Sequence, residues 1–302
     1  MKPVEAIADY GDLCGECPTW SPRDQVLYWS DISGRKLYRY AWPARTHEVH
    51  HEGVEVSGIA NHASGGLVIV NSEGIWLWKA DGKLHLVVDT VEGRKCALND
   101  CIADPEGRLF TGSCFFDPNS DDYDLGFLLR VEKDGTAQIV DEGIHLANGL
   151  GFSPDCSTLY FADSAARIIY AYDYRKDDGA IRNRRVFARI PGDQGIPDGL
   201  TVDAEGFVWS AQWFGGCIVR YDPDGTEQQR IVIPASQSSS LTFGGQDLTD
   251  IFVTSASLLD ALSLAPTNYR SDGGAVGGPL FHLNLGICGK PDYEARLQVD
   301  LT

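Results

Sequence analysis

The sequence predicts an all-β protein folded as a six-bladed β-propeller with four-stranded antiparallel blades. Short segments rich in β-branched and aromatic residues follow one another along the chain, and helical periodicity is scarce. A turn rich in Ser, Asp, Pro and Gly, followed by a strand, recurs six times at intervals of about 40 to 50 residues. A second, weaker turn between these units implies two hairpins per repeat. Four strands per repeat is the content of a propeller blade.

The expected elements follow in order along the chain. The six repeating turns begin near Ser21, Ala63, Asp104, Ser153, Asp203 and Gly244. The clearest strands cover residues 26–32, 66–72, 74–80, 108–113, 127–133, 158–164, 168–174, 207–213, 218–225 and 250–256. The weaker turns open the segments 33–40, 80–87, 132–139, 177–184 and 222–229. Two packed β-sandwiches would not explain six copies of one motif, so a ring of blades is the better prediction.

Composition and charge narrow the class of protein. No linker or composition break divides the 302 residues, so we expect a single domain covering 1–302. The net charge of −18 disfavours binding to nucleic acid or to anionic membrane surfaces. No apolar run is long enough for a membrane span, and the N-terminus lacks the apolar core of a signal peptide. We therefore expect a cytoplasmic protein, either a monomer or a small homo-oligomer, whose eight cysteines are reduced.

Four residues with side-chain oxygens precede four of the repeating turns. They are Glu16, Asn99, Asn148 and Asp198. In a propeller, matched positions in different blades face one axis, so these side chains are expected to meet in the central channel. Two carboxylates and two amide oxygens suit a hard divalent cation. Asn-Gly and Asp-Gly are also ordinary turn dipeptides, which is the simpler explanation of any one of these residues alone.

The motifs around these residues resemble the SMP-30/gluconolactonase/luciferin-regenerating-enzyme family. The resemblance rests on GECPTWSPRDQVLYWSDI, LNDCIADPEGRLFTGS, ANGLGFSPDCSTLYFADS and IPDGLTVDAEGFVWSA, which occur in this order, and it covers essentially the whole chain. It implies a propeller with one divalent metal ion in the central channel, bound by Glu16, Asn148 and Asp198. It also implies that Asn99 contacts metal-bound water or substrate. Calcium is the first expectation for the ion, with Zn²⁺, Mn²⁺, Mg²⁺ and Fe²⁺ as alternatives.

The family's best-known activity is hydrolysis of sugar lactones, so a small-molecule lactone is the expected partner. Asp198 is the candidate general base, because a carboxylate beside the metal can accept a proton from the attacking water. Many sugar lactonases of this family carry Arg two residues before the corresponding Asn, whereas this chain has Ala97 there. A side chain that could donate hydrogen bonds to sugar hydroxyls is therefore missing at this position. This favours a different lactone, or a smaller or less polar substrate.

Four further residues are candidates for the substrate site. His145, three residues before Asn148, is expected to face the cleft, although a loop histidine bonded to backbone is an alternative. The aromatic residues Phe115, Phe116 and Trp213 follow strands whose ends should reach the channel mouth, where they would form an apolar wall or pack between blades. Two other functions remain open for the same metal centre. One is a phosphotriesterase-like or aryl-ester hydrolase, and the other is a calcium-binding propeller without turnover.

Overall fold

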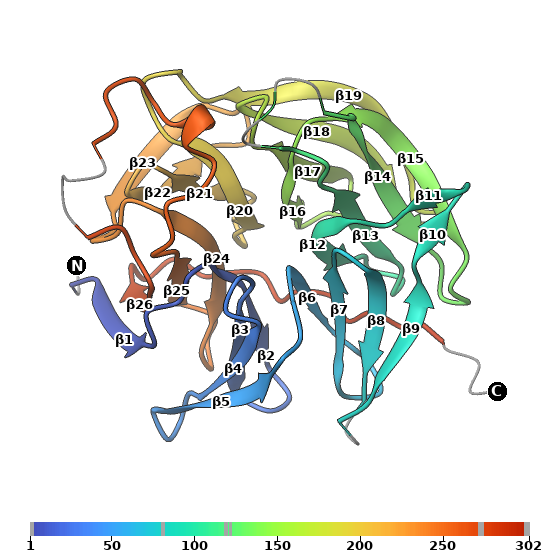
Figure 1. The fold of residues 1–302 in the computed structure, drawn as a ribbon, viewed down its shortest axis with the longest axis horizontal. Coiled ribbons are helices and arrows are strands. Elements are labelled where there is room, and N and C mark those ends of the chain that lie inside the picture. The colour runs from blue at the N-terminus through green and yellow to red at the C-terminus, as the bar shows by residue number, and fades with distance from the viewer. Residues whose placement is uncertain (1–2, 80–81, 118–119, 121–122, 271–274, 299–302) are drawn as a thin grey trace.

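The computed structural model describes residues 3–79, 82–117, 120, 123–270 and 275–298. Six four-stranded antiparallel sheets stand around a central axis, which confirms the predicted six-bladed propeller (Figure 1). The first three blades are β2 (Gly15–Ser21), β3 (Val26–Asp31), β4 (Lys36–Ala41), β5 (Thr46–Glu52); β6 (Gly58–Asn61), β7 (Leu67–Asn71), β8 (Gly74–Trp78), β9 (Leu84–Val88); and β12 (Leu98–Ala103), β13 (Leu109–Ser113), β14 (Gly126–Val131), β15 (Ala137–Ile144).

The other three blades complete the ring. They are β16 (Ala147–Phe152), β17 (Thr158–Asp163), β18 (Ile168–Arg175), β19 (Ala180–Arg189); β20 (Ile196–Val202), β21 (Val208–Trp213), β22 (Cys217–Tyr221), β23 (Glu227–Val232); and β24 (Ser238–Gly244), β25 (Asp250–Ser255), β26 (Pro279–Asn284), with β1 (Glu5–Asp9) as outer strand. Because β1 comes from the N-terminus and pairs with β26, the last blade joins both ends of the chain. A short hairpin, β10 (Thr90–Val91) and β11 (Arg94–Lys95), links the second and third blades.

Buried apolar side chains gather between neighbouring blades. Each of six apolar clusters draws its residues from two adjacent blades. The cluster that closes the ring combines Ala8, Trp20 and Trp29 with Phe252 and Leu280. The inner strands contact one another in the order β2, β6, β12, β16, β20, β24 and back to β2. The inner strands therefore line the channel with oxygen-bearing side chains and also with apolar side chains of the blade interfaces, such as Leu150 and Leu200.

The repeated acidic turns are explained by buried hydrogen bonds. Asp203 follows inner strand β20, and its Oδ1 accepts hydrogen bonds from the backbone N–H groups of Glu205 and Phe207. Its Oδ2 accepts from the indole of Trp209 and from the guanidinium of Arg220. Asp104 makes an equivalent turn after β12. An aspartate at this place both shapes the turn and neutralises a buried arginine, so the motif recurs for a structural reason.

The C-terminal segment 285–298 crosses the end of the ring where the inner strands finish. Its backbone joins the second blade through Ala295 N to Asn61 O and the third blade through Arg296 N to Gly107 O. Figure 1 shows this segment running behind the ring from β26 toward the C-terminus. The 3-10 turn η1 (Leu262–Leu264) lies in the loop between β25 and β26. All eight cysteines are free thiols, and Cys17, Cys96, Cys101 and Cys217 are buried. Among the described residues, no helix is long and apolar enough to cross a membrane.

Candidate metal centre in the channel

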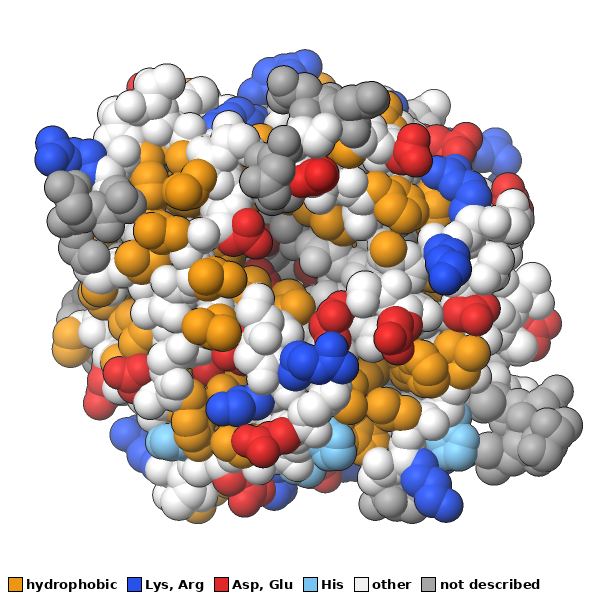
Figure 2. Space-filling model, in the orientation of Figure 1, with side chains coloured by type: hydrophobic (Ala, Val, Ile, Leu, Met, Phe, Trp, Pro, Cys, Tyr) orange, Lys and Arg blue, Asp and Glu red, His pale blue; other side chains and the backbone are white. Residues whose placement is uncertain are grey.

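Four inner strands bring the predicted oxygen residues to one cavity. Glu16 lies on β2, Asn99 on β12, Asn148 on β16 and Asp198 on β20, and all four line a cavity of about 260 Å³. Each lies within its inner strand, near the strand's beginning, rather than in a turn. The far end of each strand leads into the repeating turn, so the cavity opens on the opposite face. Figure 2 shows this face of the ring hollowed at its centre, with acidic side chains around the hollow.

Irregular strand pairing aims these side chains at the axis. The ladder between β2 and β3 shifts between Glu16 and Thr19, and the ladder between β20 and β21 shifts between Pro197 and Leu200. Similar shifts occur at Leu98/Cys101 and Asn148/Leu150. A bulge leaves one residue out of the ladder and turns its side chain away from the regular alternation. The bulges therefore separate the channel side chains from those that pack between blades.

The two asparagine amides present oxygens to the cavity because their N–H groups are used elsewhere. The Asn99 amide donates to Ala147 O (2.7 Å) and to Asn148 Oδ1 (2.9 Å). The Asn148 amide donates to Ser164 Oγ (3.0 Å). The Asn99 Oδ1 atom accepts no hydrogen bond from a described residue, and Asn148 Oδ1 retains a second lone pair. Both side chains are thus held with acceptor capacity free on the cavity side.

The two carboxylates line one cavity, Asp198 buried and Glu16 half-buried, and neither has a cationic partner among the described residues. Glu16 Oε2 accepts one hydrogen bond, from Cys17 N (3.1 Å), and Asp198 Oδ1 has no hydrogen-bond partner although it is fully buried. Burial raises the pKa of Glu16 to about 8, and the charge of Asp100 contributes. Burial, followed by the charges of Glu16 and Asp100, raises the pKa of Asp198 well above its ordinary value. An unpartnered buried carboxylate is costly, so this pair is suited to a cation.

The donor set fits one hard divalent ion. Among the described residues, no group of three or more His, Cys, Asp and Glu side chains is arranged to hold a metal. An ion here would therefore need the asparagine oxygens as well as both carboxylates, a combination typical of calcium and magnesium sites rather than zinc sites. The half-buried thiols of Cys14 and Cys114 also line the cavity. Burial raises the pKa of both, which keeps them protonated and makes them poor ligands.

The cavity wall agrees in part with the predicted substrate residues. Trp213 lines it, is 7% exposed, and has an indole N–H without a hydrogen-bond partner. Phe116 lines the cavity, whereas Phe115 packs against the core between the second and third blades and contacts the ring of Phe127. His145 is not among the described lining residues. Its Nδ1 pairs with the Tyr123 hydroxyl (3.1 Å), and its backbone N–H donates to Asp163.

One part of the cavity wall has no signal in the sequence. Asp260 and Ala261 reach it from the long loop between β25 and β26, which is outside the repeat pattern. Ala97 contributes its carbonyl to Cys114 N (2.9 Å), and nearby Arg94 is bound to Glu142 and stacked over Phe127. Arg94 therefore does not replace the missing arginine at the cavity. Every charged side chain among the described lining residues is a carboxylate: Glu16, Asp198 and Asp260.

Known proteins resemble this chain in sequence and in fold. A model of the SMP-30/Gluconolactonase/LRE-like region matches residues 14–257, which contain all four oxygen residues. The chain belongs to this family. It is 35% identical to the pentonolactonase XacC of Haloferax volcanii over 98% of this chain and 99% of that protein. It is 35% identical to a 6-deoxy-6-sulfogluconolactonase of Pseudomonas putida over 84% and 87%. A calcium-binding regucalcin from Agrobacterium tumefaciens superposes with a TM-score of 0.82 at 27% identity, covering 97% of each chain.

Proposed function

We propose that this chain is a lactonase that depends on one divalent cation and hydrolyses an uncharged sugar-type lactone to the hydroxy acid. The observation that supports this proposal most is the buried, unpartnered Asp198 oxygen beside Glu16, in an open cavity with an apolar wall. Family relatives that are lactonases support the reaction, and the calcium-binding regucalcin supports the choice of ion. Calcium is the ion we propose, bound by Glu16, Asn148 and Asp198, with Asn99 beside it.

The residues of the chain divide the chemistry between them. A divalent ion bound here would polarise the lactone carbonyl and stabilise the negative charge that develops on its oxygen. Asp198 accepts a proton from the water that attacks the carbonyl carbon, and this proton is later given to the ring oxygen as the ester bond breaks. The product then carries a carboxylate and a free hydroxyl. Asn99, held by Ala147 O and Asn148, orients the substrate or the attacking water.

The lining of the cavity supports an uncharged substrate. Phe116, Ile196 and Trp213 provide an apolar wall. With a divalent ion bound, the three lining carboxylates leave one excess negative charge near the mouth. A lactone with a sulfonate or carboxylate group would be repelled by it, and the described lining holds no cation to receive such a group. We therefore propose a substrate of the pentonolactone kind rather than a sulfonated lactone.

Metal reconstitution tests the proposed reaction. The protein is stripped with chelator, restored with single metal ions, and assayed for acid release from a panel of aldonolactones, a phosphotriester and an aryl ester. We expect chelator-sensitive hydrolysis of at least one neutral aldonolactone, fastest with Ca²⁺. Faster phosphotriester turnover would favour the phosphotriesterase-like alternative. Metal binding without acid release above a buffer blank would reject the lactonase and leave a calcium-binding propeller.

An isosteric substitution tests the role of Asp198. Asp198→Asn keeps the size of the side chain but removes the base and one charge. We expect kcat to fall by about 10²–10⁴-fold and calcium affinity to fall as well. The metal-free variant should melt no lower than the metal-free wild type, since it lacks an unpartnered buried charge. The exposed Asp224→Asn serves as the charge-matched control. Activity within threefold of wild type in Asp198→Asn would contradict the assignment.

A further inference from the structure

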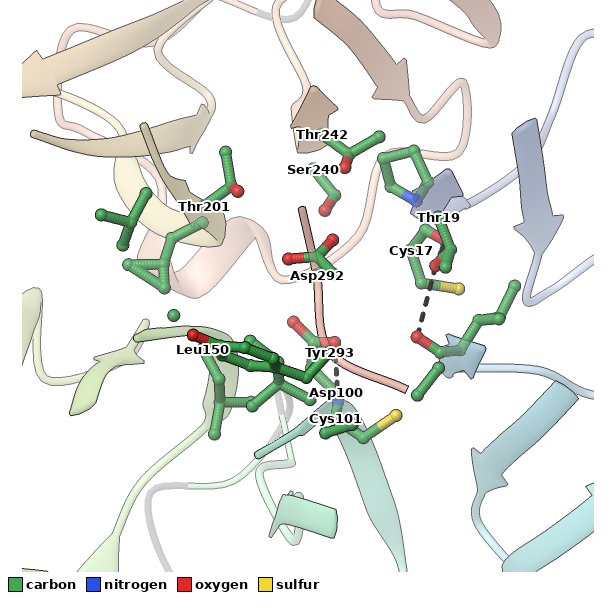
Figure 3. Close-up of a pocket in the computed structure, with 18 of the residues that line it drawn as sticks. Cys17, Thr19, Asp100, Cys101, Leu150, Thr201, Ser240, Thr242, Asp292 and Tyr293 are labelled. Carbon is green, nitrogen blue, oxygen red and sulfur yellow. Dashed lines mark hydrogen bonds between the residues drawn. The ribbon is translucent and has the colours of Figure 1, made fainter. Parts of the chain in front are cut away.

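A second, separate cavity occupies the channel on the side closed by the C-terminal segment. It has a volume of about 60 Å³ and is lined by the inner strands and by Lys290, Asp292 and Tyr293 of that segment. Figure 3 shows Asp292 and Asp100 one below the other near the middle of the view, with Ser240 above Asp292 and Thr201 to the upper left. None of the four oxygen residues of the upper site lines it. The lower cavity therefore needs an explanation of its own.

Neither carboxylate of the lower cavity accepts a hydrogen bond from a described side chain. Asp100 Oδ1 accepts from Cys101 N (2.7 Å), the residue that follows it, and no described side chain donates to it. Asp292 is half-buried and has no hydrogen bond to a described residue. Both carboxylates line the same cavity of about 60 Å³. A ligand that carries positive charge would relieve both groups.

Two neutral oxygens point independently to a ligand in the same space. Thr201 is 8% exposed and Ser240 is 6% exposed, and neither hydroxyl has a hydrogen-bond partner among the described residues. Their neighbours behave differently, since the Thr19 hydroxyl donates to Cys17 O and Ile59 O. Both hydroxyl oxygens retain accessible surface, so they are open to the cavity and available to a ligand there. Thr201 and Ser240 come from β20 and β24, so they add oxygens from two blades that hold neither carboxylate.

The remaining groups around the cavity do not satisfy these oxygens. The Lys290 ammonium donates to Pro291 O (3.3 Å) and lies 4.7 Å from the centre of the Tyr293 ring. Its charge lowers the pKa of Asp292, but by less than burial raises it. The thiols of Cys17 and Cys101 also line the cavity, and the Cys17 thiol pairs with the Ser30 hydroxyl (3.2 Å). Thiols are soft ligands that hard cations do not prefer, which leaves an oxygen-only ligand set.

We propose that this lower cavity binds a second hard divalent cation, of the Ca²⁺ class, between Asp100 and Asp292 and the hydroxyls of Thr201 and Ser240. Calcium accepts irregular sets of carboxylate, neutral oxygen and water ligands, whereas Mg²⁺ requires near-octahedral geometry. The ion joins the third, fifth and sixth blades to the C-terminal segment. Its role is structural, because the lower cavity is closed by that segment and shares no lining residue with the upper site.

Counting bound ions tests the proposal without reference to turnover. Chelated wild-type protein is titrated with Ca²⁺, and bound calcium per chain is measured by equilibrium dialysis with elemental analysis and by native mass spectrometry. We expect two equivalents in the wild type and one in Asp292→Asn. The variant should also lose part of the calcium-induced rise in Tm, because an ion that binds only the folded state stabilises it. Asp224→Asn, an exposed aspartate in the turn after β22, is the control and should bind two.

Two further results keep the test decisive. Lys290→Met removes the competing ammonium, and we expect it to bind the second equivalent at least threefold more tightly than the wild type. One equivalent in the wild type, or two in Asp292→Asn, overturns the second site and leaves a cavity that holds water only. Loss of both equivalents in Asp292→Asn would show misfolding, and the Lys290→Met affinity then decides. Two bound ions without lactone hydrolysis would reject the proposed function and keep this inference.

Discussion

At the scale of single residues, Asp198 shows most clearly that the channel is built for a ligand. Its Oδ1 atom is buried and has no hydrogen-bond partner among the described residues. In contrast, four backbone and side-chain donors bind the buried carboxylate of Asp203, which directly follows the same strand. Both aspartates occur in the same sequence motif, so the motif alone does not separate the structural residue from the candidate ligand. The difference lies in what surrounds each carboxylate. Asp203 meets Arg220, while Asp198 faces Glu16 across the channel.

We expect Asp260 to determine which substrate charge the cavity accepts. It is exposed at the mouth, and its charge adds to the rise in pKa of the Cys14 and Cys114 thiols on the cavity wall. For Asp260→Lys we compare kcat/KM for a sulfonated lactone with kcat/KM for a neutral pentonolactone. We expect this ratio to rise by about tenfold or more relative to the wild type. Added salt should reduce the increase. Asp224→Lys makes the same charge change far from the mouth. An equal ratio in both variants would argue against the role of Asp260.

The neighbours Phe115 and Phe116 show why single positions at the mouth are hard to assign from sequence. Both follow strand β13, and adjacent residues in extended chain point to opposite sides. Phe116 lines the cavity and Phe115 packs against Phe127. The aromatic pair predicted an apolar wall, but the conformation of the loop after β13 decides which of the two rings faces the cavity. His145 illustrates the same limit, because its partner Tyr123 lies in a loop without any repeat signal.

At the scale of elements, the bulged inner strands decide the geometry of the site. Asn148-Gly149 and Asp198-Gly199 read as turn dipeptides, yet both lie inside strands β16 and β20. The glycines are needed for close approach between blades. A methyl group on Gly149 would lie 2.6 Å from Asp198 O and would also collide with the Leu200 backbone. Glycine at this place lets β16 and β20 approach until Asn148 and Asp198 share one cavity.

Gly149→Ala tests this close approach. The added methyl group meets backbone atoms rather than a flexible side chain, so we expect the free energy of unfolding to fall by about 1–3 kcal/mol. Calcium affinity should fall as well, because Asn148 and Asp198 move apart. Urea unfolding and calcium titration measure the two effects. Gly192→Ala is the matched control, since nothing lies within 4 Å of its added methyl group. Unchanged calcium affinity in Gly149→Ala would show that the strand spacing does not set the site.

At the scale of the whole molecule, the propeller places apolar contacts between blades and acidic oxygens on the axis. The outer strands carry the polar surface. Strand β19 has a run of exposed arginines that discourages edge-to-edge pairing, and β5 is exposed along most of its length. Closure through β1 and β26 makes the spacing of the inner strands a property of the entire ring. Charge repulsion on the axis is then resisted by every blade interface at once.

This arrangement predicts a pH dependence of the metal-free protein. Glu16 has a pKa raised from 4.5 to about 8 in the folded state. A raised carboxyl pKa means that the folded state holds the proton of Glu16 more tightly than the unfolded state does. The protonated side chain therefore contributes its full stabilisation below a pH of about 4.5, and this stabilisation is lost as the pH rises through about 8. The free energy of unfolding of metal-free wild type should therefore fall across this window relative to that of Glu16→Gln.

Calcium should reverse the sign of this effect. The ion binds the deprotonated carboxylates, so saturating Ca²⁺ stabilises the wild type more at pH 8 than at pH 5. Urea unfolding of wild type and Glu16→Gln, each with chelator and with calcium, measures all four curves. Parallel curves for the two metal-free proteins would mean that Glu16 is not held in a strained, partly protonated state.

The sequence by itself determined the architecture and the chemical types at its centre. Six turn-and-strand repeats require a ring, and Glu16, Asn99, Asn148 and Asp198 occupy matched places in four of them. Strand periodicity and turn chemistry are local, so a single chain displays them directly. The tertiary structure alone decided that Phe116 rather than Phe115 faces the cavity, that Asp260 reaches its mouth, and that Asp292 closes the lower channel against Asp100. These residues come from unrepeated segments, whose placement depends on contacts with distant blades rather than on their own sequence.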